Sequence, residues 1–112
     1  MVNKPSLKFG GNSAHYVPSK HHIQMPLQSS FVDSDSYYKV FFHELIHSTG
    51  HETILNRKGI TSAQGFGSTS YSKEELIAEM GAMFICAVLD IEPKDNKANS
   101  QAYINGWVRK LK

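Results

Sequence analysis

The chain has 112 residues, of which 40% are hydrophobic and 20% are charged, and its net charge is +2. This length indicates a single domain, residues 1–112, with one modest core. The small net charge excludes the strong basic field typical of nucleic-acid-binding proteins, so we expect such binding by this chain alone to be weak or absent. Its apolar runs are shorter than the roughly 18 residues that cross a membrane, and its first residues have no apolar signal core. We therefore expect a cytoplasmic protein with no membrane partner.

The single cysteine, Cys86, excludes a disulfide within the chain and a zinc site built from cysteines. It lies in the apolar run "GAMFICAVL", which predicts a small buried side chain.

The N-terminal third of the chain predicts a β-hairpin. Residues 1–10 are rich in small and polar side chains, and we expect them to be loosely ordered. "AHYVP" (14–18) and "HIQMP" (22–26) are typical of two short strands joined by a turn at 19–21. Each run ends in proline, which favours the edge of a sheet.

Helical patterns fill most of the remaining sequence. The first helix is predicted over 33–50, with Asp33, Ser34 or Asp35 as its N-cap and Gly50 at its end. A connection over 51–70 follows, and a connection of that length is usually functional or has local structure. Further helices are predicted over 71–91, beginning with a Ser72–Glu75 capping box, and over 100–112. The whole pattern predicts a small α+β domain composed mainly of helices.

The first helix contains His43, Glu44 and His47 in the pattern H-E-x-x-H. Residues four apart on a helix lie one turn apart on the same face, so both imidazoles can bind one ion, and zinc suits imidazole ligands. Glu44 would lie beside the open metal position and could take a proton from metal-bound water, whose pKa falls to about 7. The alternative is an ordinary amphipathic helix that contains histidines.

A catalytic zinc site needs a third protein ligand. The metzincin pattern would place a histidine at position 53, which is Thr53, so a glutamate from a later helix is the remaining common solution. Spacing allows Glu75 or Glu79. We predict Glu79, because Glu75 is assigned to the capping box and a carboxylate on the apolar stripe between Leu76 and Met83 needs a metal or a strong partner. The small residues that follow it, Gly81 and Ala82, would let the two helices approach closely.

Three further residues are candidates for supporting roles. His51 could orient a ligand or stabilise an oxyanion, or it could simply favour the dipole at the helix end. Tyr71 could stabilise an oxyanion or serve only in packing. Glu75 could support a ligand if it is not a cap.

Several separated motifs together resemble a known family. The runs "HELIHSTGH", "LNR", "FGS", "YSKEELIAEMGAMFICAVLDI" and "AYINGWVRKLK", with "AHYVPSKHHIQMP" before them, are similar to the zincin-like metallopeptidase domain at the C-terminus of ArdC-type antirestriction proteins of plasmids, phages and mobile elements. The resemblance implies Zn²⁺ bound by His43, His47 and a glutamate in "EELIAE", with Glu44 as the catalytic base. ArdC-type proteins also have an N-terminal domain linked to single-stranded DNA binding, to which nothing here corresponds, so we do not transfer the antirestriction role.

Two functions of different classes follow. The first is a zinc metallopeptidase that hydrolyses a protein or peptide substrate with metal-activated water. The second is a non-catalytic, zinc-stabilised module that binds protein or DNA, in which Glu44 would have no purpose. The sequence leaves the oligomeric state open.

Overall fold

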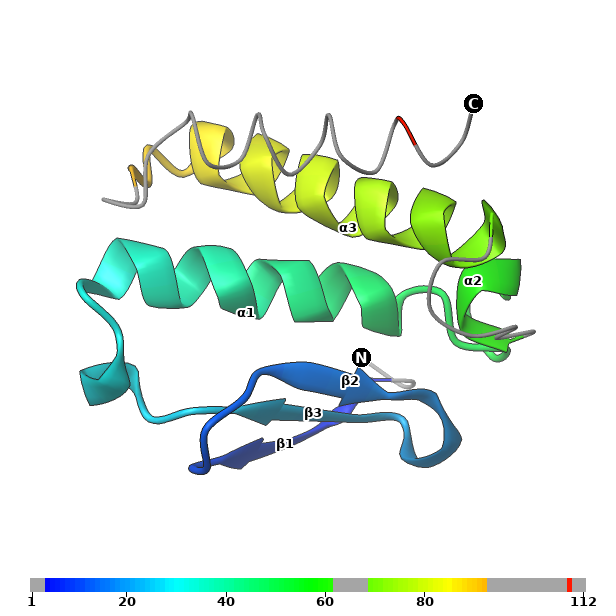
Figure 1. Ribbon diagram of the computed structural model, residues 1–112, viewed down its shortest axis with the longest axis horizontal. Helices are drawn as coiled ribbons and strands as arrows, with labels where there is room; N and C mark the ends of the chain where they lie inside the picture. The colour runs from blue at the N-terminus through cyan, green and yellow to red at the C-terminus, as the bar shows by residue number, and fades with distance from the viewer. Residues whose placement is uncertain (1–3, 62–68, 93–108, 110–112) are drawn as a thin grey trace.

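The computed structural model describes residues 4–61, 69–92 and 109, and they form a sheet and two long helices in three layers (Figure 1). Helix α1 (Ser34–Ser48) lies between the sheet and helix α3 (Thr69–Val88). The other elements are the strands β1 (Ser6–Phe9), β2 (His15–Val17) and β3 (His22–Met25), the short 3₁₀ helices η1 (Pro18–Lys20) and η2 (Gln28–Ser30), and helix α2 (Lys58–Thr61). This arrangement confirms the predicted α+β class. Among the described helices, none has both the length and the apolar character needed to span a bilayer.

The sheet has the order β1-β3-β2 and contains the predicted hairpin together with one unexpected strand. β2 pairs antiparallel with β3, which confirms the hairpin. β1 pairs parallel with β3, so the expectation of loose order is wrong for residues 6–9. All four residues of β1 are exposed, so the alternation of polar and apolar side chains in "SLKF" does not reflect a buried face. Gly10 and Gly11 follow it with φ of 126° and 77°, values that other residues rarely adopt.

An apolar core joins the sheet to α1. Ile23 and Met25 of β3 are completely buried, and Tyr37 of α1 packs against them. The helix begins as predicted, because Oδ1 of Asp33 accepts a hydrogen bond of 2.8 Å from the backbone N–H of Ser36. The core and the cap together fix the position of α1 on the sheet.

The interface between α1 and α3 is built on small side chains. Ala78 and Ala82 are completely buried, and a Cβ atom at Gly81 would lie 3.0 Å from Cδ1 of Ile46. The expected close approach of the two helices is therefore confirmed, as is the burial of Cys86.

The buried face of α3 is rotated from the predicted stripe. Met80 is exposed, and the residues turned inward include three glutamates along with the small side chains: Glu74, Glu75, Ala78, Glu79, Ala82 and Cys86. This helix therefore presents carboxylates to α1.

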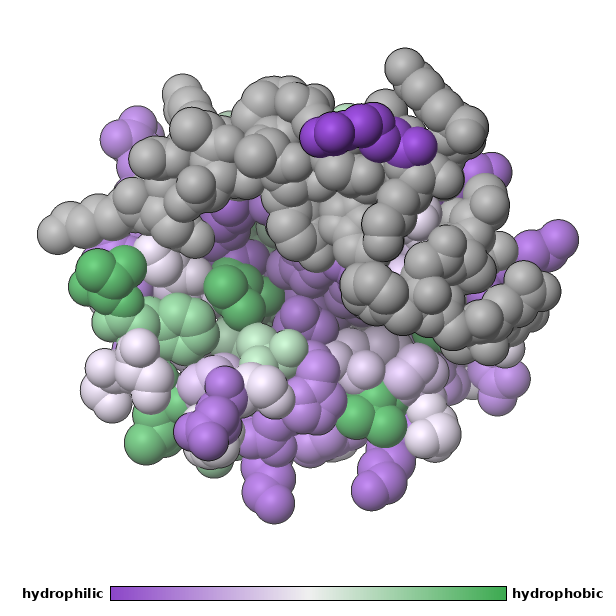
Figure 2. Space-filling model, in the orientation of Figure 1, coloured by the Kyte–Doolittle hydropathy of each residue, from purple (hydrophilic) through white to green (hydrophobic). Residues whose placement is uncertain are grey.

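The connection after α1 has local structure as expected, since turns at 51–56 lead into α2. The predicted C-terminal helix lies outside the described residues except for Arg109. On the face shown in Figure 2, hydrophilic residues predominate along the sheet, with separate hydrophobic residues between them.

Candidate metal centre

The H-E-x-x-H residues gather at one point on α1. His43, Glu44 and His47 each offer one ligand atom, and these atoms lie within 4.8 Å of one another. They face a pocket of about 460 Å³ between α1, α3, α2 and the edge strand β2. The pocket is lined by Ala14, His15, Tyr16, Pro18, His43, Glu44, His47, Gly59, Ile60, Tyr71, Glu74 and Glu75.

Glu75 of α3 lies between the two histidines. One of its carboxylate oxygens is 3.3 Å from Nε2 of His43, and the other is 3.2 Å from Nε2 of His47. The predicted capping box is therefore wrong: α3 already begins at Thr69, so Ser72 lies inside the helix and the carboxylate of Glu75 faces the site instead of the helix start.

The other ring nitrogen of each histidine contacts a different glutamate of α3. Nδ1 of His43 is 3.1 Å from Oε2 of Glu79, and Nδ1 of His47 is 2.8 Å from Oε2 of Glu74. The structure thus places Glu79, the predicted third ligand, at Nδ1, whereas Glu75 is the glutamate that meets both Nε2 atoms.

A cation pairs with each of the two outer glutamates. Nζ of Lys39 is 3.2 Å from Oε1 of Glu79. The guanidinium of Arg57 meets both oxygens of Glu74, with Nε at 2.8 Å and Nη2 at 3.0 Å. It also donates to Oγ1 of Thr49 at 2.8 Å and to the carbonyl oxygen of Ile46 at 2.6 Å. Arg57 therefore joins the end of α1 to α3.

Gly50 leaves space for its neighbours just after the end of α1. A Cβ atom at this position would lie 2.7 Å from Cγ1 of Ile60 and 3.0 Å from Nη2 of Arg57. Neither neighbour could stay in place beside a larger residue.

These contacts shift the pKa values of both histidines upward. Burial by itself would lower the pKa of His43, but hydrogen bonds to Glu75 and Glu79 outweigh it and raise the pKa to about 9. The pKa of His47 is raised in the same way, by Glu74 and Glu75 against the effect of burial.

The glutamates divide into two groups. Burial raises the pKa of Glu44, which the neighbouring histidines only partly oppose. Burial also acts to raise the pKa of Glu74 and of Glu79, but Arg57 and His47 lower the first and His43 and Lys39 lower the second, so both pKa values end below the ordinary range. Of these three glutamates, Glu44 is the one whose pKa is raised.

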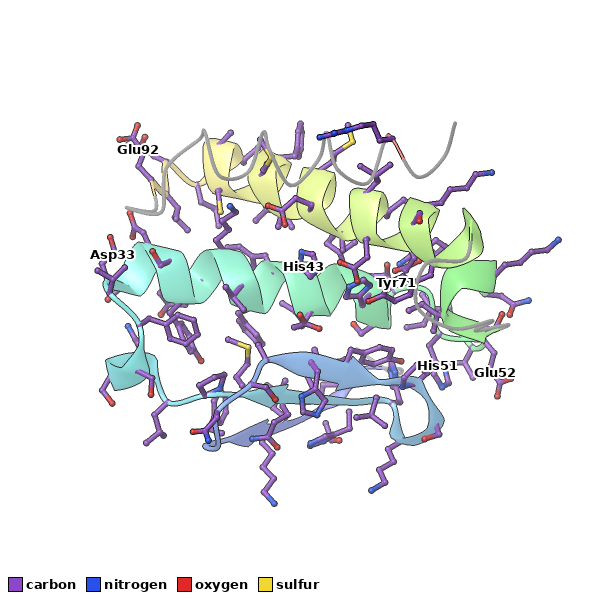
Figure 3. All side chains as sticks on the ribbon, viewed as in Figure 1. Asp33, His43, His51, Glu52, Tyr71 and Glu92 are labelled. Atoms are coloured by element: carbon purple, nitrogen blue, oxygen red, sulfur yellow. The ribbon has the colours of Figure 1, made fainter. Side chains whose placement is uncertain are left out.

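Tyr71 and His51 take different places. Tyr71 belongs to α3, and its side chain (Figure 3) lines the pocket together with His43. Burial, followed by the charge and hydrogen bond of Glu75, raises the pKa of Tyr71 to about 12. His51 lies at the turn after α1, where its ring packs 4.2 Å from that of His21 and its Nδ1 accepts a hydrogen bond from the N–H of Thr53. His51 is not among the residues that line the pocket, and its role at a ligand or an oxyanion stays a prediction.

Sequence reasoning missed Glu74, Arg57 and Lys39. Glu74 is 2% exposed, although it follows Lys73 near the start of the predicted helix, where charged residues are typical of a solvated turn. Arg57 belongs to the "LNR" motif, and a charged residue in an otherwise irregular connection was a signal that could have found it. Lys39 lies four residues before His43 on α1, so helical spacing places it near that histidine.

His43, Glu44 and His47 form a group that could hold a metal ion, and a glutamate of a second helix lies between the two histidines. This arrangement is of the zincin type. The chain belongs to the zincin-like metallopeptidase family, which residues 2–112 match.

Its relatives are longer proteins. It is 39% identical over 101 residues to the DNA primase TraC of Escherichia coli, covering 90% of this chain and 7% of TraC. It is 34% identical to the uncharacterized protein y4eC of Sinorhizobium fredii, and the match covers 95% of this chain and 33% of y4eC. The chain also matches the crystal structure of the antirestriction protein ArdC from the R388 plasmid, with Mn(II) bound, with a TM-score of 0.74 and 33% identity. This match covers 97% of this chain and 39% of ArdC. The chain thus spans well under half of each of these relatives, and the likeness to ArdC confirms the expected resemblance.

Proposed function

We propose that this chain binds one zinc ion through His43, His47 and Glu75 and hydrolyses peptide bonds with Glu44 as the general base. Two imidazole nitrogens and one carboxylate are a ligand set of catalytic zinc sites, which keep a fourth position for water. We propose Glu75 in place of Glu79, the ligand expected from the sequence, because Glu75 contacts both Nε2 atoms. The Mn(II)-bound ArdC structure supports a divalent metal in this family, and imidazole ligands favour zinc here.

The observation that supports catalysis is the position of Glu44. Its side chain is buried and lines the same pocket as the two histidines, and burial raises its pKa. When bound, zinc supplies an activated water and polarises the carbonyl oxygen of a peptide bond. The carboxylate of Glu44 accepts a proton from the attacking water and returns it to the leaving amine. A site that served only structure would have no use for this carboxylate.

The pocket is lined on one side by β2, an edge strand of the sheet. An extended peptide is the substrate that such an edge accommodates, since backbone groups there can pair with a further strand. We therefore propose a protein or peptide substrate.

The Glu44→Gln variant tests the proposal. It should bind zinc and keep its fold, but cleave an unstructured protein substrate about 10²- to 10⁴-fold more slowly, the usual worth of a general base. Glu52→Gln, at an exposed position of the turn after α1, is the matched control and should cleave like the wild type. Equal rates for Glu44→Gln and the wild type would rule out Glu44 as the base.

A further inference from the structure

Each histidine of the site uses both of its ring nitrogens on carboxylates of α3. The Nε2 atoms face Glu75, and the Nδ1 atoms face Glu74 and Glu79. A neutral imidazole has one N–H group and one lone pair. If Nε2 offers its lone pair to a metal, Nδ1 must have the hydrogen, and it then donates to the outer glutamate. Glu74 and Glu79 therefore select the tautomer that can bind the metal.

The two outer glutamates are unequal. Glu74 is 2% exposed, and Arg57 meets both of its oxygens through a planar guanidinium. Such a two-point contact fixes orientation as well as charge. Glu79 is paired with Lys39 through a single contact of 3.2 Å, and an ammonium group on a flexible chain fixes orientation less well.

We propose that Arg57 and Glu74 are the principal positioning pair of the metal centre: Glu74 turns the ring of His47 so that Nε2 faces the metal, and Arg57 holds Glu74 in that position. Lys39 and Glu79 do the same for His43 with a smaller effect. The inference rests on the proposed metal site and adds residues that do not touch the metal.

Arg57 also links this pair to the end of α1. It binds the carbonyl oxygen of Ile46 and the hydroxyl of Thr49, which flank the second histidine of the motif on the chain. One side chain thereby sets both the backbone around His47 and the carboxylate that orients its ring. This double role makes Arg57 more than a partner that neutralises Glu74.

The first experiment measures metal binding by the full chain. Glu74→Gln should lower zinc affinity about 10- to 100-fold, the usual effect of losing such a partner. Glu79→Gln should lower it less, and Glu52→Gln should leave it unchanged. The visible absorption spectrum of the cobalt(II)-loaded protein should change in Glu74→Gln, because it reports the ligand arrangement. A change that only loosened the fold would leave the spectrum of the bound metal unaltered.

A double-mutant cycle tests whether Arg57 acts through Glu74. Arg57→Gln should lower zinc affinity in the wild-type background but have little further effect in Glu74→Gln. Arg57→Lys, which keeps the charge, should recover part of the loss. If Arg57→Gln alone does not fold, as seen by circular dichroism, the Arg57→Lys change made in both backgrounds completes the cycle.

The outcomes separate this inference from the proposed function. Zinc affinity and a cobalt spectrum like the wild type in Glu74→Gln, together with loss of zinc in Glu75→Gln, would overturn the positioning role and leave the ligand set standing. Wild-type zinc affinity in Glu75→Gln would overturn both. Additive losses in the cycle would show that Arg57 does not act through Glu74.

Discussion

Three glutamates of α3 contact different ring nitrogens of the two histidines. Glu75 and Glu79 lie one turn apart on α3, and Glu74 is rotated from Glu75 by about 100°. This rotation places one carboxylate at the two Nε2 atoms and the other two at the Nδ1 atoms. A difference of a single position therefore separates the glutamate that contacts both Nε2 atoms from one that contacts an Nδ1 atom, and the proposed roles of ligand and orienting residue follow from this difference.

We expect Glu75→Ala to lose zinc and Glu79→Ala to keep it with weakened affinity. The first removes the carboxylate that faces both Nε2 atoms, whereas the second removes a partner of Nδ1. Metal content after dialysis, followed by competition with a coloured chelator, measures both effects. The reverse result, zinc lost from Glu79→Ala and kept by Glu75→Ala, would restore the assignment made from the sequence.

For single residues, the sequence predicts which side chains share a helix face better than it predicts which face of one helix packs against another. His43 and His47 could be recognised because a separation of four fixes two side chains on one face of any helix. The choice between Glu75 and Glu79 depends on how α3 is rotated against α1, which is a tertiary property. Ser72 and Glu75 matched a capping pattern, yet α3 begins at Thr69 and the pattern has no helix start to cap.

At the scale of elements, the distance between α1 and α3 sets the site. Gly81 lets Ile46 approach where any side chain would intervene. The small pair Gly81–Ala82 made this close approach predictable from the sequence. Strand β1 was not predicted, because its exposed residues are held by hydrogen bonds to β3 and not by burial.

Gly81→Val should separate the two helices. Its Cβ would lie 3.0 Å from Cδ1 of Ile46, and overpacking of this kind costs about 1–3 kcal/mol. We expect a lower urea midpoint and weaker zinc binding, because α3 also carries Glu75. Met80→Val places the same β-branched residue at an exposed position of the same helix and serves as the control. Equal zinc affinity in the two variants would show that the helix spacing does not govern the site.

At the scale of the whole molecule, a rise in pH should lower the stability of the metal-free protein and increase the stabilisation that zinc adds. In the metal-free protein the pKa of His43 is about 9, above its ordinary value of 6.5. Its protonated form therefore stabilises the fold fully below pH 6.5, and this contribution is lost as pH rises through 9. Zinc requires neutral histidines, so its affinity rises over the same range.

We therefore expect the Tm of the chelator-treated protein to fall between pH 6.5 and 9, while the increase in Tm produced by a fixed excess of zinc grows. A free ligand at a concentration of about 1,000 times its Kd adds about 4 kcal/mol to the free energy of unfolding, which makes the difference easy to measure by calorimetry. A zinc-induced increase that stays constant across this range would contradict the protonated state of His43 in the metal-free site.

The order of the elements along the chain has a consequence for biosynthesis. The sheet and α1 precede α3, and domains generally acquire structure as the chain is made from the N-terminus. A nascent chain that has just completed α1 already presents His43 and His47, but their carboxylate partners, Glu74, Glu75 and Glu79, have yet to be translated. Two imidazoles alone are an incomplete ligand set. If the proposed ligand set is right, metal binding follows the translation of α3, and a metal-bound protein is one in which α3 has already packed on α1.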